Sequence, residues 1–124
     1  MKSILVAVLL IVPFTKTGIE PQPVLSPREY IVKYAEVYKA PEKELIMVSK
    51  CESNFNPNAI GDGGKAKNIF QYHEPTFNRY EKLLGEELDY NSYHDQARLT
   101  AFIFANYPKE KKAWSCFTRI NKVK

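Results

Sequence analysis

The sequence predicts a mainly α protein that folds as one domain and contains one irregular loop. Apolar side chains recur at the three- and four-residue spacing of helices in several segments, and no segment alternates apolar and polar residues as a strand does. The chain has 124 residues, of which 44% are hydrophobic and 13% aromatic, a composition that suits a single core. Residues 51–77 are rich in Asn and Gly, so we expect an irregular loop there, with a small β element at most.

Two helices are expected before this loop. Ser26, Pro27 and Glu29 form a capping-box pattern with proline at the first helical position. A second helix is expected to start at Pro41, because proline is favoured in the first turn. The face of the first helix that we expect to pack in the core consists of Ile31, Tyr34, Ala35 and Tyr38.

Three helices are expected after the loop. Pro75 can open the first of them, and Gly85 can end it. Ser92 is a suitable N-terminal cap for the next helix, which Pro108 ends. A last helix is expected over residues 109–120, with a solvated lysine-rich face. Its apolar side chains at helical spacing are Ala113, Trp114, Phe117 and Ile120.

Glu52 is the first candidate catalytic residue. Leu45, Val48 and Glu52 stand at positions i, i+3 and i+7, so they share one face of the second helix. If the two apolar residues face the core, Glu52 turns inward at the last turn, where desolvation and the negative helix end raise a carboxyl pKa. A carboxyl that stays protonated near neutral pH suits a general acid. A solvated glutamate at a helix end remains the alternative, because Glu is mostly exposed.

The residues around Glu52 form a recognisable series. Glu52 and Ser53 are followed by Phe-Asn-Pro-Asn-Ala over residues 55–59 and by a short Gly-rich loop that leads to Gln71. From residue 51 to about residue 77 this series resembles the lytic transglycosylase family with the lysozyme-like fold, of the soluble lytic transglycosylase and goose-type lysozyme kind. Asn68 departs from the family pattern, which has Gly there. Asn tolerates a positive φ better than most residues, so we expect the turn to survive.

The resemblance implies cleavage of the β-1,4 bond between N-acetylmuramic acid and N-acetylglucosamine in peptidoglycan by a monomer without a cofactor. Glu52 would protonate the leaving oxygen. The same residue, now ionised, would take the proton of the muramyl 6-hydroxyl, which closes a 1,6-anhydro ring. Ser53 and Gln71 would position Glu52 or the N-acetyl group of the substrate. Tyr72 and Asn68 are further candidates for substrate binding, and a packed core position is an equal alternative for Tyr72.

Two other functions remain open. A hydrolytic lysozyme would use Asp62 as its base, although Asp62 can equally cap the Gly-rich turn over residues 61–64. A wall-binding module without activity is the other, and the Asn at position 68 is the one hint of it. The family's later Ala-Tyr-Asn motif has no clear match, so the sequence assigns no role to Tyr107.

Cys51 and Cys116 are the two cysteines of the chain. An even count in an exported protein favours a disulfide. A nucleophilic Cys51 with His73 as its base is the alternative, but it lacks a local thiol-protease signature. We expect no metal site, because the cysteines, His73 and His94 lack the compact spacing of zinc ligands.

Residues 1–17 resemble a signal peptide, with Lys2 before a short apolar run. The run is too short to span a membrane, so we expect export to the periplasm or the cell exterior, with an uncleaved anchor as the alternative. Residues 18–25 would form a linker and residues 26–124 the domain. Removing the signal leaves 16 basic and 14 acidic residues. This weak positive balance argues against nucleic-acid binding.

Overall fold

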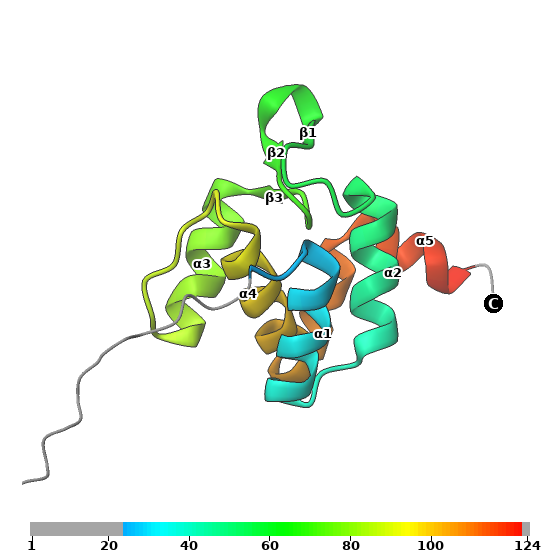
Figure 1. Ribbon diagram of the computed structural model, residues 1–124. Helices are drawn as coiled ribbons and strands as arrows, with labels where there is room; N and C mark the ends of the chain where they lie inside the picture. Colours follow the sequence, from blue (N-terminus) through cyan, green and yellow to red (C-terminus); the bar gives the residue numbers. More distant parts are fainter. Residues whose placement is uncertain (1–23, 123–124) are drawn as a thin grey trace, which may run out of the picture.

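The computed structural model describes residues 24–122, so the expected signal peptide and most of the expected linker lie outside the described residues. Five α-helices form most of the domain, and a small sheet stands above them (Figure 1). The prediction of a mainly α fold with a small β element is confirmed. The helices are α1 (Pro27–Tyr38), α2 (Glu42–Ser53), α3 (Glu74–Leu84), α4 (Tyr93–Asn106) and α5 (Ser115–Lys122).

The predicted helix ends agree closely with the structure. The backbone N–H of Glu29 donates to Ser26 Oγ at 3.2 Å, and the Ser26 N–H donates to Glu29 Oε1 at 2.9 Å, which completes the capping box of α1. The Ser92 hydroxyl caps α4 by accepting the Asp95 N–H at 3.1 Å, and Gly85 ends α3 in the left-handed conformation. Helix α2 was predicted to start at Pro41 and starts one residue later, at Glu42, with Pro41 as its N-cap.

Helix α4 lies at the centre of the domain. It packs against α1 along its length and also contacts α2 and α3. Leu99, Ala101 and Ile103 of α4 are fully buried, as are Ile31 of α1 and Leu45 of α2. Tyr34 and Tyr38 are only partly buried and pack at the edge of this core. The helices therefore form a solid base on which the loop between α2 and α3 rests.

That loop contains the three-stranded sheet. Strands β1 (Ile60–Gly61), β2 (Ala66–Lys67) and β3 (Tyr72–His73) pair antiparallel in this order, and a short 3₁₀ helix, η3 (Asp62–Gly64), connects the first two. Each strand has only two residues. Residues that directly oppose each other share a face, so Ala66 and His73 lie on the same side of the sheet.

The predicted single helix over residues 109–120 is wrong. The chain instead forms a 3₁₀ helix, η4 (Pro108–Ala113), and then α5, with Trp114 extended between them. The break places the Trp114 indole in the core, where its N–H donates to the Phe70 carbonyl oxygen at 2.9 Å. Both 3₁₀ and α turns bring residues three apart to one face, so apolar spacing alone contained no signal for the break.

Between residues 24 and 122, no helix is long and apolar enough to cross a membrane.

Candidate active site

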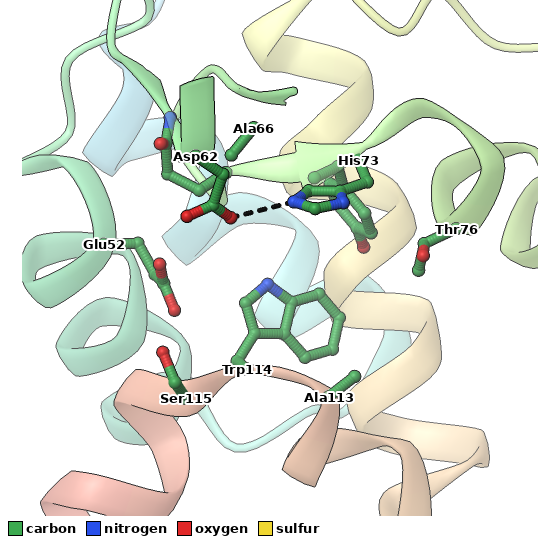
Figure 2. Close-up of a pocket in the computed structure, with 10 residues that line it drawn as sticks. Glu52, Asp62, Ala66, His73, Thr76, Ala113, Trp114 and Ser115 are labelled. Carbon is green, nitrogen blue, oxygen red and sulfur yellow. Dashed lines mark hydrogen bonds and ion pairs between the residues drawn. The ribbon is translucent and has the colours of Figure 1, made fainter. Parts of the chain in front are cut away.

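A cleft of about 390 Å³ lies between the sheet and the helical base. Glu52 at the end of α2, Asp62 of η3 and His73 of β3 line it, and Trp114 forms its floor (Figure 2). The remaining lining residues are Ala66, Gln71, Tyr72, Thr76, Ala113 and Ser115.

Glu52 is half-buried in this cleft, as the helical spacing predicted. Leu45 and Val48 of the same face are buried in the core, which turns the Glu52 carboxyl inward. Burial raises the pKa of Glu52, and the negative charge of Asp62 acts in the same direction. The backbone N–H of Cys116 donates to Glu52 Oε2 at 3.3 Å, and this bond and the charge of Arg119 partly offset the rise of the pKa. The carboxyl is therefore suited to hold a proton when substrate arrives.

Asp62 faces the same cleft and pairs with His73. Asp62 Oδ2 lies 2.8 Å from His73 Nε2, and the side chains are 68% and 44% exposed. The sequence left open whether Asp62 caps the turn over residues 61–64 or acts as a base, and in the structure its carboxylate bonds to His73. The backbone of Asp62 is left-handed, with φ of 51°, which directs the side chain towards the cleft (Figure 2).

The Gln71 side chain forms hydrogen bonds to two backbone carbonyls of the loop between α2 and α3. Its Nε2 donates to the Ala59 carbonyl oxygen at 3.0 Å and to the Asn68 carbonyl oxygen at 2.9 Å. Its Oε1 lies so close to Gly61 that a Cβ atom there would be only 2.6 Å away. Gly61 is therefore needed for close approach, and the Gln71 amide sets the shape of the cleft wall.

Ser53 and Asn68 are absent from the cleft lining among the described residues. Ser53 Oγ donates to the Ile69 carbonyl oxygen at 2.7 Å. Asn68 has φ of 75°, as expected for a residue that replaces Gly. Its Nδ2 donates to the Asn91 carbonyl oxygen at 2.9 Å, and its Oδ1 accepts the Ile69 N–H at 2.7 Å. Both side chains support the loop backbone, and a contact of either with substrate stays a prediction.

Tyr72 and Tyr107 differ in their relation to the cleft. Tyr72 borders it, but the side chain is buried, and its hydroxyl lies 2.8 Å from Thr100 Oγ1. Tyr107 packs on Phe102 at the end of α4 and lines no part of the cleft within the described region. Sequence reasoning missed Thr76, Trp114 and Ser115 as lining residues. Trp114 and Ser115 lie some sixty positions after Glu52, and no local motif pointed to them.

The two cysteines are joined in a disulfide. Cys51 and Cys116 are separated by 65 residues in sequence, and their Cα atoms lie 6.0 Å apart. This bond removes the thiol that a nucleophilic Cys51 would need. In the part of the chain that the structure describes, no three His, Cys, Asp or Glu side chains gather as metal ligands.

A family model described as the transglycosylase SLT domain matches residues 29–98, more than half of the chain. The chain belongs to the transglycosylase SLT family. The matched region includes Glu52, Asp62 and Gln71. Three further residues that line the cleft, Ala113, Trp114 and Ser115, lie after the matched region. Comparison with curated proteins and with solved structures finds no match. Family membership supports a transglycosylase-type action on peptidoglycan.

Proposed function

We propose that this SLT domain is a lytic transglycosylase that cleaves the β-1,4 bond between N-acetylmuramic acid and N-acetylglucosamine, with Glu52 as general acid and then base. The observation that carries the proposal is the position of Glu52. Its half-buried carboxyl faces the cleft, and burial raises its pKa. A protonated carboxyl at this point can donate to the leaving glycosidic oxygen.

The second half of the reaction uses the ionised carboxylate. Glu52 takes the proton of the muramyl 6-hydroxyl, and this oxygen closes on the anomeric carbon to give a 1,6-anhydro end. The acetamido group of the substrate assists at the same carbon. The Cys116 N–H stabilises the carboxylate formed after the first transfer. Gln71 supports the wall of the cleft through its two backbone contacts.

Mass spectrometry of the fragments that the purified protein releases from peptidoglycan tests this proposal. We expect 1,6-anhydromuramic ends. Reducing ends, which contain one more water, would replace the proposal with a hydrolytic lysozyme. Binding to peptidoglycan without release of fragments would indicate a wall-binding module.

A hydrolytic lysozyme is the second candidate, because Asp62 lines the same cleft as Glu52. A typical glycosidase uses two carboxyl groups that flank the scissile bond. Figure 2 shows both carboxylates directed into the space above the Trp114 ring. In the transglycosylase mechanism Asp62 has no chemical step and only adds negative charge near Glu52.

The Asp62→Asn variant separates these two mechanisms. It keeps the shape of the side chain and removes the charge and the basicity. We expect activity within about tenfold of wild type, because an exposed side-chain contact such as Asp62–His73 contributes only about 0–1 kcal/mol. A hydrolase that activates water with Asp62 should lose at least about 10²-fold. Initial rates of turbidity loss measure the difference.

Asp89→Asn is the matched control for that experiment. Asp89 is exposed and accepts the Asn91 N–H at 2.9 Å in a turn that does not line the cleft. Its variant should retain wild-type activity. A loss of about 10²-fold in the Asp62 variant alone, at an unchanged melting temperature, would contradict the one-carboxylate mechanism.

The place of action is part of the same proposal. Peptidoglycan lies outside the cytoplasm, and a disulfide is typical of exported proteins. We therefore propose residues 1–17 as a signal peptide or anchor, residues 18–25 as a linker and residues 26–124 as a monomeric domain.

A further inference from the structure

The disulfide joins two elements that both border the active-site cleft. Cys51 directly precedes Glu52 near the end of α2, and Cys116 follows Trp114 and Ser115, which line the cleft, at the start of α5. The same residue, Cys116, supplies the backbone N–H that donates to Glu52. Cys116 therefore provides both the disulfide to Cys51 and the hydrogen bond to the Glu52 carboxyl.

We propose that the Cys51–Cys116 disulfide is a positioning device for the reaction: it holds the Cys116 N–H on the Glu52 carboxyl, so that full activity requires the oxidised protein. The inference rests on the proposed function, because it takes Glu52 as the acid and base. It adds a positioning group, the Cys116 backbone, and a dependence on redox state.

Apart from the disulfide, α5 is held by non-covalent contacts. The helix has eight residues and packs against α2 and η4. An isolated helix of this length is not stable in water, so it depends on its attachments. Phe117 packs at the edge of the core. Arg119 lies against both sulfur atoms, with nitrogen to sulfur distances of 3.6 Å for Cys51 and 3.7 Å for Cys116. Cleaving the disulfide therefore removes the covalent cross-link between α5 and the Glu52 helix and leaves only their packing contacts.

Reduction has a defined chemical course. A dithiol cleaves the S–S bond in a two-electron step, which gives the thiols of Cys51 and Cys116 and the disulfide of the reductant. When the S–S bond is broken, Glu52 loses the Cys116 N–H and lies farther from the charge of Arg119. Trp114 stays bonded to the Phe70 carbonyl oxygen, so the floor of the cleft and the burial of Glu52 are kept. The Cys116 N–H and the charge of Arg119 lower the pKa of Glu52, whereas burial and the charge of Asp62 raise it, so the loss of the first two raises the pKa. His73 and the buried Tyr72 are the other titratable side chains that line the cleft.

Reduction is expected to change two measured quantities, the rate of cleavage and the position of the alkaline limb of the pH–rate profile. The rate of glycan cleavage falls by about tenfold or more, because Glu52 loses a hydrogen bond that stabilises its charged form. The alkaline limb of the pH–rate profile moves to higher pH, because the general acid stays protonated longer once its pKa rises. A purely structural loss lowers the rate without moving that limb.

The test compares oxidised protein, protein reduced with dithiothreitol, reoxidised protein and the Cys51→Ser/Cys116→Ser variant, all below their melting temperatures. Reduced protein and the double variant should show the lower rate and the shifted limb, and reoxidation should restore both. Ser26→Ala is the control, since it weakens the capping box of α1 far from the cleft. Its melting temperature should fall while its alkaline limb stays in place. An unshifted limb in folded, reduced protein would overturn the proposal.

A second measurement uses only the folded, oxidised protein. The amide proton of Cys116 should change its NMR chemical shift with pH, following the same apparent pKa as the alkaline limb, and should not do so in Glu52→Gln. A Cys116 amide that is insensitive to pH in the wild type would overturn the positioning role. Full activity of Glu52→Gln would instead overturn the proposed function, so the two failures can be distinguished.

Discussion

Replacing Glu52 with glutamine is expected to lower the rate of glycan cleavage by at least about 10²- to 10⁴-fold, the usual contribution of a general acid. Gln has the same shape and can still accept the Cys116 N–H, so the contact with α5 remains. The proton that the leaving oxygen needs is then missing. Release of soluble fragments from labelled peptidoglycan measures the rate, and thermal unfolding checks the fold.

Glu87→Gln is the matched control, because Glu87 is exposed and lies outside the cleft. It should cleave at the wild-type rate. A Glu52→Gln protein that clears cell-wall suspensions as fast as wild type would show that another group supplies the proton.

The Trp114→Ala variant should lose about 3–5 kcal/mol of unfolding free energy, the usual cost of removing a large buried aromatic side chain. The Trp114 ring lies within 6.5 Å, centroid to centroid, of Phe70, Tyr72, Tyr80 and Phe104. Its removal leaves a cavity among these rings and opens the floor of the cleft. Urea unfolding followed by circular dichroism measures the change.

Trp114→Phe divides that loss into packing and hydrogen bonding. It keeps an aromatic ring and removes the N–H that the Phe70 carbonyl accepts. A buried carbonyl left without a partner costs about 1–3 kcal/mol, so this variant should be more stable than Trp114→Ala. Equal unfolding free energies for the two variants would show that the ring contributes little beyond its hydrogen bond.

The first four helices were predictable because local chemistry marks their ends. Ser26 and Ser92 bond to the first turn of their own helices, and Gly85 adopts a conformation that other residues avoid. Such signals act over three or four residues. The break at Trp114 depends on a hydrogen bond to Phe70, which is distant in sequence, so neither spacing nor caps could indicate it.

The candidate site divides in the same way. Helical periodicity placed Glu52 at the cleft, because its own helix sets its direction. The sequence predicts that Ser53 and Asn68 bind substrate, whereas in the structure their side chains donate to the backbone carbonyls of Ile69 and Asn91. The Asp62–His73 contact joins η3 to β3. Only the antiparallel pairing of β1, β2 and β3 brings these two segments together, and the sequence did not indicate that pairing.

Trp114 is the single tryptophan of the chain, and its ring forms the floor of the cleft. The intrinsic fluorescence of the protein therefore comes mainly from a side chain that lines the proposed active-site cleft. A sugar ring that fills the cleft changes the surroundings of the indole, and with them the intensity or the position of its emission. Occupancy of the cleft can thus be followed in real time on the unlabelled protein, and even on a Glu52 variant that turns nothing over.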